Sequence, residues 1–105
     1  MVMLNHSEAK DALTWCRDRN HSGREVPEQL IARLEQAQAS FPRGRPIPEI
    51  MNWWKSDALE VSDEELRLIL DCVYTNTAME DAHLPKWAVE KQRMLEEKEG
   101  KDGDL

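Results

Sequence analysis

The chain has few of the residues that build β-sheets and few that form common catalytic or metal sites. Its 105 residues include one Phe, one Tyr, two Cys, three His and four Gly. Val, Ile and Thr are sparse beside Ala, Leu, Glu, Gln, Lys and Arg, which favour helices over strands. Hydrophobic residues nevertheless make up 40% of the chain, more than a disordered protein carries. The composition therefore predicts an all-α fold in a single domain.

The motifs that identify common active sites are also missing. The glycines are scattered, and none precedes a Lys-Ser or Lys-Thr pair, so no phosphate-binding loop is indicated. No His-x-x-x-His, Cys-x-x-Cys or Asp-x-Asp-x-Asp-Gly pattern occurs. Asp71 lies among apolar neighbours, but no nearby histidine makes it part of an acid–base pair. We therefore expect a non-enzymatic protein with no catalytic residue, no metal ligand and no cofactor.

Long apolar segments and secretion signals are absent too. No apolar run is long enough to span a bilayer, and the first residues lack a basic stretch followed by an apolar one. Cys16 and Cys72 both fall inside expected helices. Two cysteines without a secretion signal are typical of reduced, packed thiols. These features predict a cytoplasmic protein with no membrane partner.

Charge of one sign dominates only one half of the chain. The formal net charge is -7 and the sequence pI is about 4.9, which disfavours broad binding to phosphate backbones. Residues 1–56 hold eight Lys and Arg against seven Asp and Glu, whereas residues 57–105 hold six against fourteen. Nucleic acid is therefore not a favoured partner of the whole chain.

Helical spacing of apolar residues predicts a compact bundle of about five short to medium helices over residues 1–95. The expected helices run from Ser7 to Arg19, from Val26 and Pro27 to Phe41, from Pro48 for a few turns, from Ser62 to Met79, and from Leu84 and Pro85 to Leu95. Residues 96–105 have no apolar periodicity, so we expect a disordered, charged and largely acidic tail there.

The best-defined helix start is the one at Ser62. Ser62 and Glu65 match the capping-box pattern, and Val61 and Leu66 have the spacing of a hydrophobic staple. The helix that follows has a broad apolar stripe. Such a helix is usually central in a bundle, so we expect this one to form the core.

The candidate binding residues lie in the segment between the second and fourth helices. Arg43 and Arg45 flank a glycine in a proline-rich loop, where they form a candidate contact for anions. Trp53 and Trp54 follow on a short helix. Consecutive helical residues point about 100° apart, so we expect one indole in the core and the other at a separate contact surface.

These features favour a small regulator or inhibitor that occupies the surface of another protein, of the kind that bacteria and their phages encode. A homo-oligomer is plausible because short apolar helix faces can exceed what one core buries. One alternative is a helical oligomer that binds a small anionic ligand such as a nucleotide, through a tryptophan and an arginine. A second is a helix-turn-helix-like nucleic-acid module, which the long proline-rich connection disfavours. Imitation of DNA by the acidic half is a minor variant of the inhibitor hypothesis.

Overall fold

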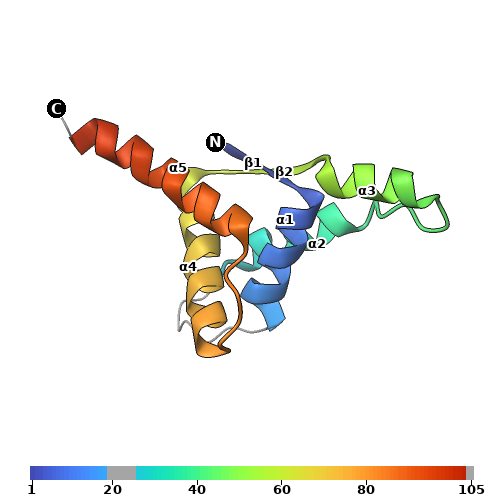
Figure 1. Ribbon diagram of the computed structural model, residues 1–105, viewed down its shortest axis with the longest axis horizontal. Helices are drawn as coiled ribbons and strands as arrows, with labels where there is room; N and C mark the ends of the chain where they lie inside the picture. Colours follow the sequence, from blue (N-terminus) through green and yellow to red (C-terminus); the bar gives the residue numbers. More distant parts are fainter. Residues whose placement is uncertain (19–25, 104–105) are drawn as a thin grey trace.

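The computed structural model describes residues 1–18 and 26–103, with the side chains of all of these except residues 18 and 99–103. Five α-helices in this part of the chain confirm the expected all-α class (Figure 1). In chain order the elements are β1 (Val2–Asn5), α1 (His6–Leu13), the π-helix η1 (Thr14–Asp18), α2 (Glu28–Gln38), α3 (Ile47–Lys55), β2 (Asp57–Val61), α4 (Asp63–Met79) and α5 (Lys86–Gly103).

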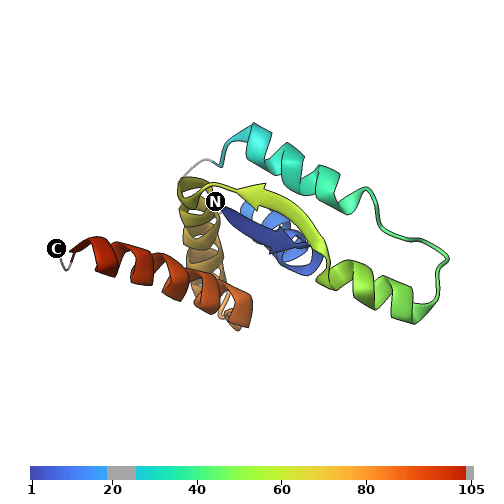
Figure 2. The same ribbon diagram turned by 90° about the horizontal axis from the view of Figure 1, so that it is seen from above.

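A small antiparallel sheet, which the sequence analysis missed, joins the start of the chain to its middle. β1 pairs with β2 so that Val2 lies opposite Val61 and Leu4 lies opposite Leu59. Val2 and Leu4 are buried while Met3 between them is exposed, which is the alternation expected of a half-buried strand. Because β1 runs into α1 and β2 follows α3, the sheet ties the start of α1 to the end of α3 (Figure 2).

The core lies between α1, α2, α4, α5 and the sheet, and α4 contributes most to it, as predicted for the central helix. Buried apolar side chains of α4 are Leu66, Ile69, Leu70, Cys72 and Val73. They pack with small residues of α1, with Trp15 and Cys16 of η1, and with two leucines of α2. Helix α3 contributes no buried residue.

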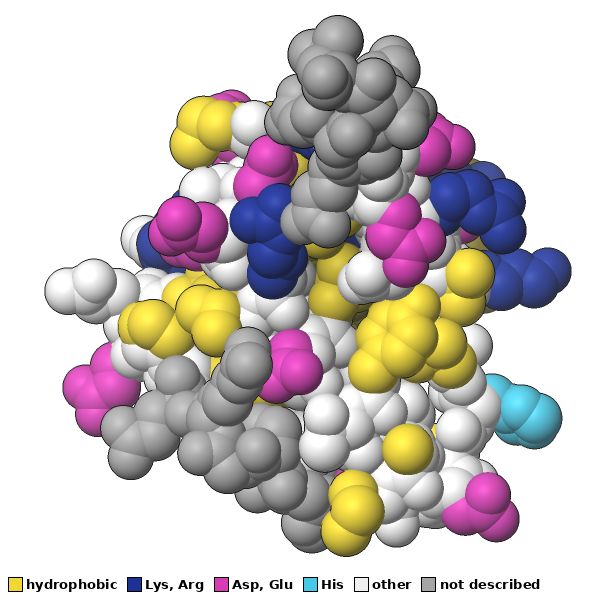
Figure 3. Space-filling model, turned by 90° about the vertical axis from the view of Figure 1, so that its left-hand side faces the viewer, with side chains coloured by type: hydrophobic (Ala, Val, Ile, Leu, Met, Phe, Trp, Pro, Cys, Tyr) yellow, Lys and Arg dark blue, Asp and Glu magenta, His cyan; other side chains and the backbone are white. Residues whose placement is uncertain are grey.

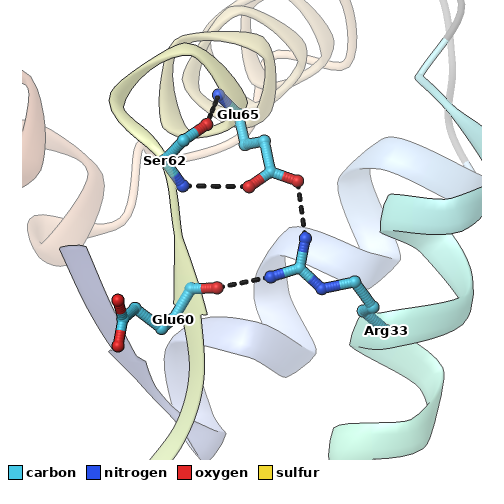
Figure 4. Close-up of polar contacts among 4 residues, drawn as sticks. All are labelled: Arg33, Glu60, Ser62 and Glu65. Atoms are coloured by element: carbon cyan, nitrogen blue, oxygen red, sulfur yellow. Dashed lines mark hydrogen bonds and ion pairs between the residues drawn. The ribbon is translucent and has the colours of Figure 1, made fainter. Parts of the chain in front are cut away.

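The predicted capping box at the start of α4 is confirmed. The Glu65 N–H donates to Ser62 Oγ over 3.1 Å, and the Ser62 N–H donates to Glu65 Oε1 over 2.9 Å. Val61 and Leu66 are both fully buried, as a staple requires. Arg33 of α2 joins this corner, since it donates to Glu65 Oε2 over 2.6 Å and to the Glu60 carbonyl (Figure 4). The network links α2 to both β2 and α4.

Helix α1 begins earlier than predicted, and its N-cap is Asn5 rather than Ser7. The Glu8 N–H donates to Asn5 Oδ1, and the Asn5 N–H donates to Glu8 Oε1, each over 2.8 Å. Asn5 and Glu8 thus have the same three-residue spacing as Ser62 and Glu65, so they cap α1 in the same way.

The other helix ends also differ from the predicted ones. Helix α2 ends at Gln38, and Phe41 lies outside it in the connection to α3. Helix α5 continues past Leu95 to Gly103, through Glu and Lys residues that favour helix, and residues 104–105 lie outside the described part. Trp87 Nε1 donates to Asp11 Oδ2 over 3.0 Å and so attaches the start of α5 to α1.

The molecule is elongated, with principal extents of 51 × 30 × 27 Å. Helices α3 and α5 lie toward opposite ends of the longest axis, and the α2–α3 loop and α3 project from one of them (Figure 1). In the ranges that the structure describes, no helix has both the length and the apolar character needed to cross a membrane.

Candidate functional site

Helix α3 owes its start to the prolines that precede and open it. Pro46 is the N-cap and Pro48 lies in the first turn, where a missing N–H costs no helical hydrogen bond. Before it, the Arg45 N–H approaches the Pro42 carbonyl at 3.4 Å, which closes a turn. Gly44 in this turn has φ of +76°, the value that a type II turn requires at its third position. Glycine is therefore favoured between the two arginines.

The two predicted arginines lie at one end of α3 and the two predicted tryptophans at the other. Arg43 and Arg45 are exposed, and Arg45 Nε lies 3.8 Å from Glu49 Oε2. The helical rise places Trp53 roughly 9 Å along the axis from Ile47. The four candidate residues thus lie along one element, but they do not form one cluster.

The two indoles lie together, so the expectation of separate surfaces for Trp53 and Trp54 is wrong. Both are half-buried, and their ring centroids are 4.8 Å apart with an interplanar angle of 72°. Phe41 contacts both, with centroid distances of 5.2 Å to Trp53 and 5.8 Å to Trp54. The angle of about 100° between consecutive helical residues fixes only their Cα–Cβ directions. Rotation about the side-chain bonds then turns both long side chains toward Phe41.

Trp53 is the more tightly held of the pair. Its ring stacks on His6 with a centroid distance of 4.0 Å, and Trp53 Nε1 donates to Ser40 Oγ over 3.1 Å. His6 Nδ1 lies 2.9 Å from the Trp53 carbonyl and 3.1 Å from the Ser56 carbonyl. Two carbonyl oxygens can only accept, so Nδ1 carries a proton. His6, which sequence reasoning placed merely near a helix end, therefore anchors the C-terminal turn of α3.

The outer side of α3 is apolar and partly exposed to solvent. Ile47 is 75% exposed and Met51 is 49% exposed, while Ile50 and Trp54 are half-buried. These four residues have the spacing i, i+3, i+4 and i+7, which places them in one stripe along the helix. We call this stripe of Ile47, Ile50, Met51 and Trp54 the α3 surface.

Two hollows adjoin the α3 surface where it meets α1. One has a volume of about 370 Å³ and apolar walls from Leu13, Phe41 and Trp54. The other has a volume of about 340 Å³ and includes Met51 and Trp54. Lys10 of α1 lines both hollows, and its Nζ lies 5.1 Å from the centroid of the Trp54 ring. We call the two hollows together the α1–α3 groove.

Neither Lys10 nor Phe41 was singled out as a binding residue from the sequence. Phe41 carried a weak signal, because it is the only Phe and directly precedes the proline-rich loop. Lys10 carried none, since its position over Trp54 depends on how α1 packs against α3. Arg43 and Arg45 line neither of the two hollows.

The most strongly shifted titratable group lies in the core rather than at α3. Cys16 and Cys72 are buried free thiols, in keeping with the packed role expected for them. A hydrogen bond with Cys72 and burial both raise the pKa of the Cys16 thiol far above its ordinary value. A thiol held protonated in this way is a poor nucleophile. Among the described residues, no three His, Cys, Asp or Glu side chains are placed to hold a metal ion.

A further hollow, of about 450 Å³, lies between α4 and α5. Its walls include Arg67, Asp71 and Glu96, so charges of both signs line it. The face of the molecule at the α5 end likewise mixes basic and acidic side chains around small apolar groups (Figure 3). Tyr74, also in this hollow, has its pKa raised by burial and by the nearby Glu96. Its mixed walls favour no single class of ligand, whereas the α3 surface is continuous and apolar.

The chain matches no family model, no curated protein and no solved structure in the three comparisons with known proteins. Any functional assignment therefore depends on the residues of the site itself.

Proposed function

We propose that the protein is a non-enzymatic regulator or inhibitor that binds another protein through the α3 surface. The observation that carries this proposal is the exposure of Ile47 and Met51 on a helix that buries none of its own residues in the core. A contiguous apolar stripe left in water has a free-energy cost that binding removes. Trp54 in the same stripe is of the residue type that most often dominates binding energies.

The contacts that hold the C-terminal end of α3 support the same function. The start of α1 fixes this end through the hydrogen bond from the His6 N–H to the Ser56 carbonyl, which spans 3.1 Å. Trp53 stacks on His6, and Phe41 contacts both indoles. A surface that is already ordered loses little conformational entropy on binding, so more of the contact energy remains as affinity.

We expect the double variant I47Q/M51Q to lose the protein partner while it keeps the fold. The measurement is affinity capture from the cells that naturally produce the protein, with quantitative mass spectrometry and circular dichroism of each variant. The matched control is M79Q/V89Q, because Met79 and Val89 are 66% and 38% exposed at positions far from α3 in the sequence. Removal of two apolar contacts should weaken binding by about 2 kcal/mol or more, roughly thirtyfold.

A partner captured equally by the wild type, I47Q/M51Q and M79Q/V89Q would contradict binding through the α3 surface. If no protein distinguishes the wild type from I47Q/M51Q, the proposed function is wrong. Capture that fails for both double variants points to a different surface or to damage common to both.

A further inference from the structure

The charges around the α3 surface differ in sign from those of the whole chain. Arg43 and Arg45 precede it, Lys55 ends the helix, and Lys10 lies beside Trp54. Glu49 is the only carboxylate on α3, and it lies next to Arg45. The net charge of the chain is -7, so this basic border is a local exception.

Two further carboxylates near the groove already have partners. Asp11 lines one hollow but accepts the hydrogen bond from Trp87 Nε1. Arg17 lines the other hollow, and Glu35 offsets its charge because Glu35 Oε1 lies 3.3 Å from Arg17 Nη1. Lys10, by contrast, has no carboxylate within ion-pair distance among the described residues. The groove therefore presents a cation beside its apolar walls.

The same charges oppose pairing of α3 with α3 of a second copy. In a parallel twofold pair, Arg45 would approach Arg45 of the other copy, and Lys55 would approach its counterpart. In an antiparallel pair, Arg45 would approach Lys55. Like charges placed opposite one another disfavour either arrangement. The surface fits an occupant that supplies carboxylates.

The shape of the surface points to a helix as that occupant. The α3 surface has apolar residues at i, i+3, i+4 and i+7, the pattern with which one helix packs along another. Nine residues of α3 extend for about 14 Å, the length of two to three helical turns. The apolar hollow at Leu13, Phe41 and Trp54 provides a place for a large side chain next to this stripe.

We infer that the α1–α3 groove and the α3 surface bind an acidic amphipathic helix of the partner protein, an inference that rests on the proposed function. Apolar residues of that helix pack on Ile47, Met51 and Trp54. Its flanking carboxylates face Lys10 and Arg43, neither of which has a carboxylate within ion-pair distance in the part of the chain that the structure describes.

The test uses three labelled synthetic peptides with the full-length protein and fluorescence anisotropy. The first has Leu at i, i+3, i+4 and i+7 with Glu on the flanks, and the second has Lys in place of Glu. The third has the same composition as the first, but its leucines do not share one face of a helix. We expect the acidic amphipathic peptide to bind at least about tenfold more tightly than either of the others, and less tightly as salt rises.

Charge-reversal variants test whether cations beside the groove and the α3 surface produce this preference. K10E/R43E should weaken binding of the acidic peptide by about tenfold or more, because two cations become anions. The matched control K86E/R93E makes the same charge change on two exposed residues of α5 and should bind as the wild type does. Circular dichroism of each variant shows whether the fold is kept.

The outcomes separate the partner class from the proposed function. Equal binding of the acidic and basic peptides, with both lost in I47Q/M51Q, would overturn the acidic specificity but leave protein binding by α3 intact. No binding of any peptide, or equal loss in K10E/R43E and K86E/R93E, would overturn the inference. Two further results would overturn the inference. One is binding of anionic phospholipid vesicles in place of the peptide, and the other is a dimer in sedimentation that I47Q/M51Q abolishes.

Discussion

Among single residues, Glu65 takes part both in the capping box of α4 and in the ion pair between α4 and α2. Its carboxylate accepts from the Ser62 N–H at the start of α4 and from Arg33 of α2 (Figure 4). The hydrogen bond from the Ser62 backbone and the charge of Arg33 lower the pKa of Glu65, although partial burial opposes them. The charged form of this residue therefore stabilises the junction of α2 and α4.

This lowered pKa predicts a dependence of stability on pH. Between the folded pKa and the ordinary value of 4.5, the unfolded chain binds the proton more readily, so stability rises with pH. The contribution of Glu65 is present above pH 4.5 and is lost as the pH falls through the folded pKa. We expect E65Q to lower the free energy of unfolding by about 1 kcal/mol at pH 7 and the difference from wild type to shrink below pH 4.5.

Urea denaturation over a pH series measures both quantities. The matched control is E64Q, which removes one charge from the exposed neighbouring residue in the same helical turn. Its free energy of unfolding should stay close to that of the wild type at each pH. A difference between E65Q and wild type that is constant from pH 7 to pH 3 would contradict the role assigned to the carboxylate.

Among the elements, α3 is held in an unusual way for a helix of a small domain. Its contacts with the rest of the protein run through Trp53, Trp54 and the backbone after them, and no α3 residue belongs to the buried core. A helix held in this way can loosen without unfolding of the core, because local opening costs less where few apolar contacts are lost.

We therefore expect W53A to raise the exchange rate of α3 backbone amides while the exchange rate of α4 amides stays unchanged. Removal of a fully buried Trp costs roughly 3–5 kcal/mol, and for this half-buried ring we expect about 2 kcal/mol, or roughly thirtyfold in exchange. Hydrogen exchange with mass spectrometry measures both helices in one sample. Parallel loss of protection in α3 and α4 would show that α3 is part of the same cooperative unit as the core.

In the whole molecule, the core and the candidate binding surface are separate. The buried residues gather between α1, α2, α4, α5 and the sheet, whereas α3 projects at one end of the longest axis. Cys16 of η1 and Cys72 of α4 lie in that core and interact with each other. Their accessibility therefore reports on unfolding of the core as a whole.

We expect neither thiol to react with a thiol reagent in the native protein and both to react after unfolding in urea. Burial excludes the reagent, and the raised pKa of Cys16 keeps its thiolate population very small. A colorimetric thiol assay across a urea series should follow the unfolding transition seen by circular dichroism. Rapid labelling of one thiol per chain without denaturant would show that the core opens locally.

The sequence predicted the features that depend on residues three or four positions apart. The capping box of Ser62 and Glu65, the apolar stripe of α4 and the all-α class follow from spacing and composition, because helical contacts are local. The same rule applied to Asn5 and Glu8 would have found the true start of α1. Four residues of the candidate site were also named from the sequence, although their arrangement was not.

Tertiary packing alone decided how the candidate site is built. The pairing of β1 with β2 joins segments far apart in the chain, and β1 begins with three consecutive apolar residues, so its sequence shows no alternation that predicts a strand. The stacking of His6 on Trp53 and the position of Lys10 over Trp54 depend on that pairing and on the packing of α1. Spacing along a chain fixes the direction in which a side chain leaves its helix, but the long-range contacts it meets fix where the ring comes to lie.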